Sequence, residues 1–385
     1  MLPYGRRTVD DADIAAVVEV LRSPFLTAGP VVATFEQALA AKVGARYASA
    51  CANGTAALHL VYAALGLTTG DEIITSPITF SATAAAAYYV GATVRFGDVD
   101  PATGNLDPAS VEALITPRTR AIVPVHLAGM PVDLEAFHAI AQRHRVALIE
   151  DACHALGATY HGTPVGSRSD ATVFSFHPVK HITTGEGGAI VTPSEALKRR
   201  IDKLRAHGIE RDPAQMQTPP EGNWAYEVQE LGWNYRLSDI ACALGISQLA
   251  KLDQFVARRR ELAVLYRSER ARVFERGVTP PPVFAERESS YHLFAVAIDF
   301  PRFHTTRKLV ADRLAAAGIG TQVHYIPLLQ HPLHAQRCPD EVGRARPGAD
   351  QYYARTLSLP MFPAMTDADV GEVVTQLARA LGEQP

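Results

Sequence analysis

Four short polar motifs in this sequence each follow an apolar segment, where a side chain could bind or activate a small molecule. Asn53-Gly54-Thr55 opens a helical pattern and its free N–H groups suit an anion, although a Gly/Thr helix start is more often only a cap. Asp151 could equally be a helix N-cap or a buried acid that takes part in chemistry. Lys180 precedes a Gly-rich turn where burial would lower the pKa of its amine, but taken alone a surface lysine is the simpler interpretation. Phe80 could present its ring to a ligand, although core packing is the commoner role of such a residue.

The four motifs together match the requirements of pyridoxal phosphate. A lysine amine forms a Schiff base with the aldehyde of this cofactor, and a carboxylate keeps its pyridine nitrogen protonated. An anion cradle holds the phosphate, and an aromatic ring packs on the cofactor face. The combination therefore predicts a site for pyridoxal phosphate, which no single motif does.

For these motifs to meet, the segments before them must be neighbouring strands of one sheet. Short apolar segments alternate with helical patterns through the first half of the chain. The expected strands are Tyr47–Cys51, Glu72–Thr75, Thr93–Phe96, Ala121–Val125, Val146–Ile149 and Thr172–Phe176, and the helices between them include Thr55–Leu65, Ser81–Val90 and Leu134–Arg143. Such alternation predicts an α/β fold with a largely parallel sheet covered on both faces, which binds ligands at the carboxyl ends of its strands.

The pattern changes after about residue 240. The expected elements there are helices at Leu237–Leu252 and Gln254–Arg276, a Pro-rich break at 280–282, strands at His292–Ile298 and Gly320–His324, a helix at Thr306–Ala317 and terminal helices. These elements predict a smaller C-terminal α+β unit. We therefore expect a large domain at 1–250 and a small domain at 251–385.

Composition argues against several classes of protein. The formal net charge of −3 gives no basic field for nucleic acid or an anionic membrane. The longest charge-free stretch, 73–94, contains Pro77 and Gly91 and suits buried elements better than a membrane span. Four scattered cysteines and a start without a signal-like apolar core predict the reducing cytoplasm. His324, His331 and His334 have no acid at ligand spacing, so we expect loop histidines and no metal site.

The motifs at 53–55, 150–154, 175–180, 184–188 and 232–236 resemble those of the DegT/DnrJ/EryC1/StrS family of nucleotide-sugar aminotransferases. The resemblance runs nearly from end to end of the chain. It implies the fold-type-I architecture of aspartate aminotransferase, with a large α/β domain and a smaller C-terminal domain. It also implies pyridoxal 5′-phosphate as the cofactor and a homodimer whose active sites are shared between subunits.

The resemblance also implies roles for individual residues. Lys180 would form the Schiff base and Asp151 would partner the pyridinium nitrogen. Further cofactor contacts would come from Gly54, Thr55, Phe80, His154 and Ser175, with Asn234 reaching the phosphate from the partner subunit. The pocket for cofactor and substrate would be lined by Tyr4, Pro24, Phe25, Leu26, Thr27, Gln322, Val323, His324 and Tyr325.

Within the family, the segments at 176–188, 289–293 and 322–325 resemble the pseudaminic acid branch. That branch moves the amino group of L-glutamate to the C4 ketone of a UDP-linked 6-deoxy sugar. Other members aminate C3 or C4 of other UDP-, GDP- or dTDP-linked keto sugars, and this alternative stays open. A dinucleotide-dependent oxidoreductase would need GxGxxG after an early strand, and the sequence has none. A non-enzymatic regulator that binds the cofactor would need neither Lys180 nor Asp151 for chemistry, so the presence of both residues argues against this class.

Overall fold

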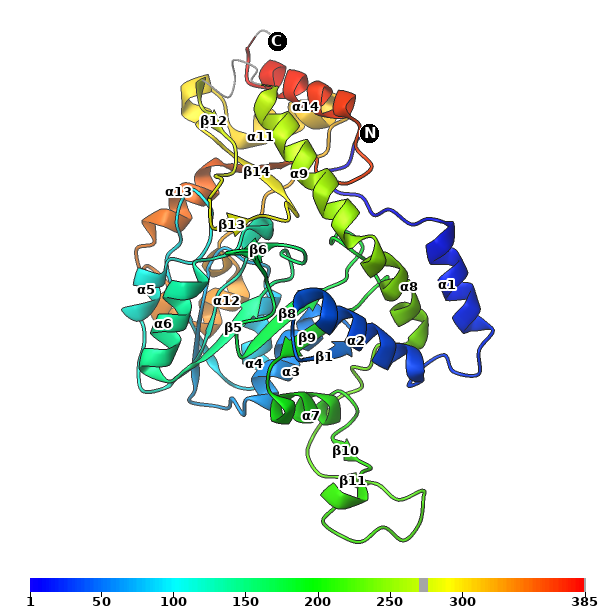
Figure 1. Cartoon of the computed structure of the whole chain (residues 1–385). Helices are drawn as coiled ribbons and strands as arrows, with labels where there is room; N and C mark the ends of the chain where they lie inside the picture. Colours follow the sequence, from blue (N-terminus) through cyan, green and yellow to red (C-terminus); the bar gives the residue numbers. More distant parts are fainter. Residues whose placement is uncertain (270–275, 384–385) are drawn as a thin grey trace.

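The computed structural model describes residues 1–269 and 276–383, and at its centre is a seven-stranded sheet (Figure 1). The strands are β1 (Tyr47–Cys51), β2 (Glu72–Thr75), β3 (Thr93–Phe96), β4 (Thr119–Val123), β5 (Ala147–Asp151), β8 (Ala171–Ser175) and β9 (Gly188–Thr192). Their order is β1-β9-β8-β5-β4-β2-β3, and β9 runs antiparallel to both neighbours. The other neighbouring pairs are parallel, so the prediction of a mostly parallel α/β sheet is confirmed.

Helices cover both faces of this sheet. They are α2 (Pro30–Val43), α3 (Gly54–Ala64), α4 (Ala82–Tyr89), α5 (Pro108–Glu112), α6 (Leu134–His144), α7 (Glu195–Leu204) and α8 (Asp239–Ala250). Successive strand residues point to opposite faces, and here both are apolar. In β2, Ile73 belongs to the core under α3, α4 and α7, whereas Ile74 packs with α6. On that second face, α2 and α8 contribute Phe35 and Leu249 to a further core.

The sequence predicts β1, β2 and β3 with the observed bounds, but it places β4, β5 and β8 up to two residues away and omits β9. The strand β9 begins at Gly188, within a Gly-rich segment typical of a turn. A Cβ at Gly188 would lie 2.5 Å from the Asn53 carbonyl carbon. Only glycine therefore lets this strand approach the start of α3 so closely.

A second, smaller core lies in the C-terminal part of the chain. Its main elements are α9 (Leu252–Ser268), β12 (Val278–Thr279), β14 (Phe294–Ile298), α11 (Arg307–Ala316), β15 (Thr356–Leu359) and α14 (Asp367–Ala380). The strands have the order β12-β14-β15, and both neighbouring pairs are antiparallel. Leu262, Val310 and Leu377 bury their side chains in this core. Only Lys251 separates α8 from α9, so the division into 1–250 and 251–385 falls at this break and stays a prediction.

Two predictions for the C-terminal part need correction. The strand expected at Gly320–His324 does not form, because only Gln322 pairs with Ser358 before the chain turns into a cavity described below. The sequence pattern also omits β15, which takes the place beside β14. The expected helix at Gln254–Arg276 is observed as α9, and its predicted part at 270–275 lies outside the described residues.

The remaining elements complete the described chain. They are α1 (Asp11–Leu21), η1 (Leu127–Gly129), β6 (Thr159–Tyr160), β7 (Thr163–Pro164), β10 (Ile209–Glu210), η2 (Pro213–Gln215), β11 (Glu227–Val228), β13 (Arg287–Glu288), η3 (Phe300–Phe303), η4 (Leu328–Gln330), α12 (Pro332–Arg337), η5 (Pro339–Glu341) and α13 (Pro347–Arg355). The β10–β11 pair extends away from the body of the molecule (Figure 1). Among residues 1–269 and 276–383, no helix is long and apolar enough to cross a membrane.

The first residues of the chain join the C-terminal core. Leu2 pairs with Ile319 in a parallel bridge, with hydrogen bonds of 2.8 Å on both sides of Leu2. Two residues later, the Tyr4 carbonyl accepts a hydrogen bond of 3.0 Å from the Met361 amide. These bonds carry Tyr4 across to the carboxyl edge of the large sheet.

Candidate active site

The carboxyl ends of β1, β2, β5 and β8 open into a cavity of about 900 Å³. In parallel α/β sheets this edge is the usual place for a ligand, because loops and helix N-termini converge there. The cavity brings together twelve of the residues expected from the sequence: Tyr4, Gly54, Thr55, Phe80, Asp151, His154, Ser175, Lys180, Gln322, Val323, His324 and Tyr325. The first half of the chain thus supplies most of the floor, and segment 322–326 supplies one wall.

The first turn of α3 faces this cavity as an anion cradle. Asn53 caps the helix, and its Oδ1 accepts a hydrogen bond of 2.8 Å from the Ala56 amide. The amides of Gly54 and Thr55 come before the intrahelical hydrogen bonds begin, so they can donate to an anion. The Ser175 hydroxyl lies beside them, since a Cβ at Gly54 would be 3.4 Å from the Ser175 Oγ.

Asp151 ends β5 as a buried carboxylate, 4% exposed. Its Oδ2 accepts a hydrogen bond of 2.7 Å from the Thr83 hydroxyl, and its Oδ1 accepts one of 3.2 Å from the Cys153 amide. No cationic side chain of the described residues forms an ion pair with it. A buried carboxylate without a cation is costly, so this site is suited to a ligand that carries positive charge.

Lys180 reaches the same cavity from the loop after β8. Burial lowers the pKa of its ammonium, and the nearby Cys153 and Asp151 oppose this effect only in part. Its backbone amide donates to the His177 carbonyl at 2.8 Å, which fixes the loop. In the described part of the chain its Nζ makes no hydrogen bond or ion pair, so the amine is available to a ligand.

His154 is held as a neutral donor. Burial, and then the charge of Lys180, keep its pKa well below the ordinary value. Its Nδ1 accepts from the Ala128 amide at 3.3 Å, which assigns the ring proton to Nε2. That proton points to the Tyr325 hydroxyl at 3.1 Å. Because the Tyr325 oxygen accepts from His154, the phenol proton of Tyr325 points away from His154 and can be donated to an acceptor in the cavity.

Phe80 and its neighbours Thr79 and Thr83 also line the cavity. Phe80 is 61% exposed, and its ring centroid lies 6.2 Å from that of Tyr325. One turn further along, the Thr83 hydroxyl donates to Asp151 and lies 2.9 Å from the Thr79 hydroxyl, which must then donate to it. This chain of hydroxyls fixes the orientation of the carboxylate.

Several residues that line the cavity are not among the individual site residues expected from the sequence, although some of them belong to the predicted motifs. They are Asn53, Thr79, Ser81, Thr83, Cys153, His177, Glu186, His292, Ile326, Leu328 and His331. Thr83 has the clearest function, because it binds Asp151. A weak signal for it exists, since Thr83 lies three residues after Phe80 and therefore on the first turn of the following helix.

Two expected parts of the site lie elsewhere in the chain. Asn234 is exposed, and its backbone pairs with Ala206 in an antiparallel bridge. The stretch Pro24–Thr27 is exposed too, and the Leu26 carbonyl accepts from the Asp239 amide at the start of α8. Neither lines the cavity of its own chain, so their predicted roles depend on a second subunit.

The three C-terminal histidines lie apart from one another, and His334 belongs to the helix α12 and not to a loop as expected. His324 contacts the Ser358 hydroxyl at 2.8 Å, and the ring centroids of His331 and His334 are 6.4 Å apart. Within residues 1–269 and 276–383, no group of three or more histidines, cysteines or acids is arranged to hold a metal ion.

A family model described as the DegT/DnrJ/EryC1/StrS aminotransferase family matches residues 7–378. The chain belongs to this family. The spore coat polysaccharide biosynthesis protein SpsC of Bacillus subtilis (strain 168) is 40% identical to this aminotransferase over 374 residues, which are 97% of this chain and 95% of SpsC. Helicobacter pylori PseC, an aminotransferase involved in the biosynthesis of pseudoaminic acid, superposes with a TM-score of 0.91 at 33% identity over 99% of both chains.

This aminotransferase depends on pyridoxal 5′-phosphate, as its family does. Spr1654 of Streptococcus pneumoniae in its PLP form has a TM-score of 0.88 and 27% identity to it, over 99% of this chain and 98% of Spr1654. The residues of the cavity fit the cofactor. The first turn of α3 suits its phosphate, the amine of Lys180 suits its aldehyde, and the unpaired carboxylate of Asp151 suits its ring nitrogen.

Proposed function

We propose that this sugar aminotransferase transfers the amino group of L-glutamate to the C4 ketone of UDP-2-acetamido-2,6-dideoxy-β-L-arabino-hexos-4-ulose. The product would be UDP-4-amino-4,6-dideoxy-N-acetyl-β-L-altrosamine, a precursor of pseudaminic acid. The observation that carries this proposal is the similarity to Helicobacter pylori PseC over 99% of both chains. The volume of the cavity, about 900 Å³, supports it, because cofactor and sugar must fit there together.

Each predicted cofactor residue has a role in this proposal. Gly54, Thr55 and Ser175 would bind the phosphate, and Asp151 would keep the ring nitrogen protonated. When bound, pyridoxal phosphate supplies an electron sink for the electron pair that a departing proton leaves behind. Phe80 and His154 would hold the ring, and the neutral state of His154 avoids a second positive charge beside it.

Lys180 would move the proton in both halves of the reaction. Its neutral amine would take the proton from Cα of L-glutamate, and its ammonium would later give a proton to C4 of the sugar. The lowered pKa of Lys180 favours this, because more of the amine is neutral near pH 7. Two substrates that use one amine in turn predict ping-pong kinetics.

Because the proton comes from one side, the orientation of the sugar would fix the configuration at C4. Tyr4 and segment 322–325 line the cavity and are the proposed contacts for the acceptor. The phenol of Tyr325, whose proton is directed away from His154, can donate to a polar group of the sugar. A wrong epimer would leave such a group unpaired, which costs about 1–3 kcal/mol.

We therefore expect the L-arabino 4-keto sugar to be aminated with a kcat/KM at least about tenfold above that of its D-xylo epimer. The measurement offers each epimer separately with L-glutamate, follows 2-oxoglutarate release and assigns the C4 configuration of the product by NMR. A preference for the D-xylo epimer would contradict the proposed substrate and leave the cofactor chemistry as described.

A second acceptor has support from the relatives. SpsC, at 40% identity, is named for spore coat polysaccharide biosynthesis, so another UDP-, GDP- or dTDP-linked 3- or 4-keto-6-deoxy sugar is the alternative substrate. A panel of keto sugars under the same assay would distinguish the two.

For location we propose the cytoplasm, since Cys51, Cys153, Cys242 and Cys338 are all free thiols.

We further propose a homodimer with shared sites, in which Asn234 reaches the cofactor phosphate of the partner subunit and Pro24–Thr27 line its pocket. The exposed apolar side chains support such an interface. Phe25 and Leu26 lie beside the start of α8, and Trp224 and Leu231 belong to the region of the β10–β11 pair. Large apolar side chains gathered on a surface are typical of protein contacts.

Shared sites predict complementation between two inactive variants. Lys180→Ala and Asn234→Ala subunits, once mixed and exchanged, should regain about a quarter of wild-type activity, because half of the dimers are mixed and each has one intact site. The control mixes Lys180→Ala with the double variant Lys180→Ala/Asn234→Ala, which should stay inactive. If exchange is demonstrated and activity does not return, each site is built within one chain.

A further inference from the structure

Part of the cavity is formed by a segment of the C-terminal unit, which we call the C-terminal wall (residues 326–338). Ile326, Leu328 and His331 of this wall line the cavity. The Leu328 amide donates a hydrogen bond of 2.9 Å to the carbonyl of Pro77. The wall therefore lies against the loop between β2 and α4, which carries Phe80.

His334 joins this wall to that loop. It is 1% exposed, its Nε2 lies 2.9 Å from the Ser81 hydroxyl and its Nδ1 lies 3.0 Å from the Tyr88 hydroxyl. Burial lowers the pKa of His334, so the neutral ring donates one of these hydrogen bonds and accepts the other. In the described structure, the Ser81 hydroxyl therefore points to His334 and makes no side-chain cap for α4.

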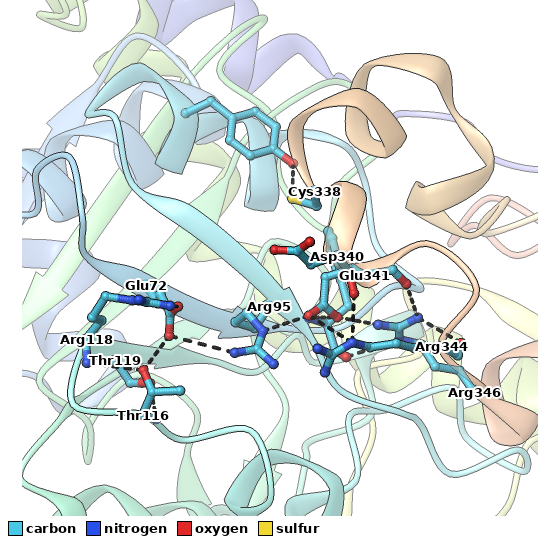
Figure 2. Close-up of polar contacts among 12 residues, drawn as sticks. Glu72, Arg95, Thr116, Arg118, Thr119, Cys338, Asp340, Glu341, Arg344 and Arg346 are labelled. Atoms are coloured by element: carbon cyan, nitrogen blue, oxygen red, sulfur yellow. Dashed lines mark hydrogen bonds and ion pairs between the residues drawn. The ribbon is translucent and has the colours of Figure 1, made fainter.

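The residues that directly follow the C-terminal wall are bound to the large sheet. Glu341, 1% exposed, accepts a hydrogen bond of 2.7 Å from Arg95 on β3 and also pairs with Arg346. Figure 2 shows Glu341 between these two arginines, with Cys338 close by. The Cys338 thiol lies 3.4 Å from the Tyr88 hydroxyl. A buried polar network with these bonds satisfied holds its members in one arrangement.

We propose that His334 is a positioning residue of the active site, which fixes Phe80 through the hydrogen bond to Ser81. Phe80 is exposed to the cavity and adjoins Ser81, so a shift of Ser81 moves the ring. The bond to Tyr88, in contrast, lies on the far side of the imidazole and serves the packing of α12 against α4. This inference rests on the proposed function, because it is tested by the binding of the cofactor and of the keto sugar.

Two isosteric variants separate these bonds. In His334→Gln the side-chain amide can occupy the place of Nε2 and keep Ser81, whereas in His334→Asn it occupies the place of Nδ1 and keeps Tyr88. Each variant loses one neutral hydrogen bond, so their melting temperatures should fall by similar amounts. Ser81→Ala and Tyr88→Phe remove the same two bonds from the other side.

The readouts are the dissociation constant of pyridoxal phosphate, the circular dichroism of its bound absorption band, and KM for the keto sugar. His334→Asn and Ser81→Ala should raise the dissociation constant and KM by about fivefold to tenfold and change the dichroism. His334→Gln and Tyr88→Phe should stay within about twofold of wild type in these readouts. Equal effects of Gln and Asn, or a larger effect of Gln, would overturn the proposal. A wild-type enzyme that binds the cofactor but aminates no keto sugar would instead contradict the proposed function, and the dichroism would still decide the role of His334.

Discussion

Replacing Lys180 by alanine should lower transaminase turnover by about 10⁴-fold or more, because the variant lacks the amine that takes and returns the proton. The folded variant should still bind pyridoxal phosphate through the first turn of α3 and Ser175, but without a covalent bond. Turnover is measured as 2-oxoglutarate release from L-glutamate. The covalent bond is followed by the visible absorption of the bound cofactor.

Two controls show whether the loss at Lys180 is chemical. Lys308→Ala removes an exposed lysine of α11 that pairs with Asp312, and it should leave turnover unchanged. Methylamine added to Lys180→Ala should restore part of the activity, because a small amine can enter the space left by the side chain. Turnover of Lys180→Ala within tenfold of wild type would remove Lys180 from the reaction.

The second large effect is expected for Asp151→Asn. The variant should retain pyridoxal phosphate but lose about tenfold to hundredfold or more in kcat, since a neutral amide cannot stabilise a protonated ring nitrogen. The Asn oxygen can still accept from the Thr83 hydroxyl, so the local packing is retained. The measurement is kcat with saturating L-glutamate and keto sugar.

Glu150 offers a matched control on the same strand. Burial alone would raise the pKa of Glu150, but the hydrogen bond from His126 at 2.7 Å keeps that pKa below its ordinary value. Glu150 belongs to this pair and does not line the cavity. Glu150→Gln should therefore lower the melting temperature and leave kcat nearly unchanged. The helix N-cap that the sequence position of Asp151 allows is not formed, since β6 follows β5 with no helix between them. Wild-type kinetics of Asp151→Asn would therefore limit Asp151 to the hydrogen bonds that it accepts from Thr83 and from the Cys153 amide.

The parts of the fold that the sequence predicts are those encoded by local patterns. β1, β2 and β3 are short apolar segments bounded by turns, and each has the expected bounds. β9 cannot be predicted from local patterns, because Gly187 and Gly188 indicate a turn. The strand depends on a distant contact, in which Gly188 packs on the start of α3. β15 likewise depends on β14, a partner more than fifty residues earlier in the chain.

The residues of the site likewise divide into those that local patterns predict and those that depend on distant contacts. The motifs at strand ends are predictable, because a parallel sheet must gather its carboxyl ends at one edge. Thr83 and His334 are not, since each acts through a hydrogen bond to a residue of another element. His334 looks like an ordinary loop histidine until its two hydroxyl partners are placed beside it. Asn234 and Pro24–Thr27 lie outside the cavity of their own chain, and no pattern within one chain can locate a second subunit.

The bridge between Leu2 and Ile319 has a consequence for the order in which the enzyme matures. Contacts between residues so far apart in sequence form late, because the chain between them must first be synthesised and ordered. The Tyr4 carbonyl accepts a hydrogen bond from the Met361 amide, so the part of the cavity that Tyr4 lines is incomplete until Met361 has left the ribosome. The large sheet can fold earlier, during translation. A nascent chain that ends before Met361 would therefore have the first turn of α3 and Lys180 but not the side of the cavity that Tyr4 lines.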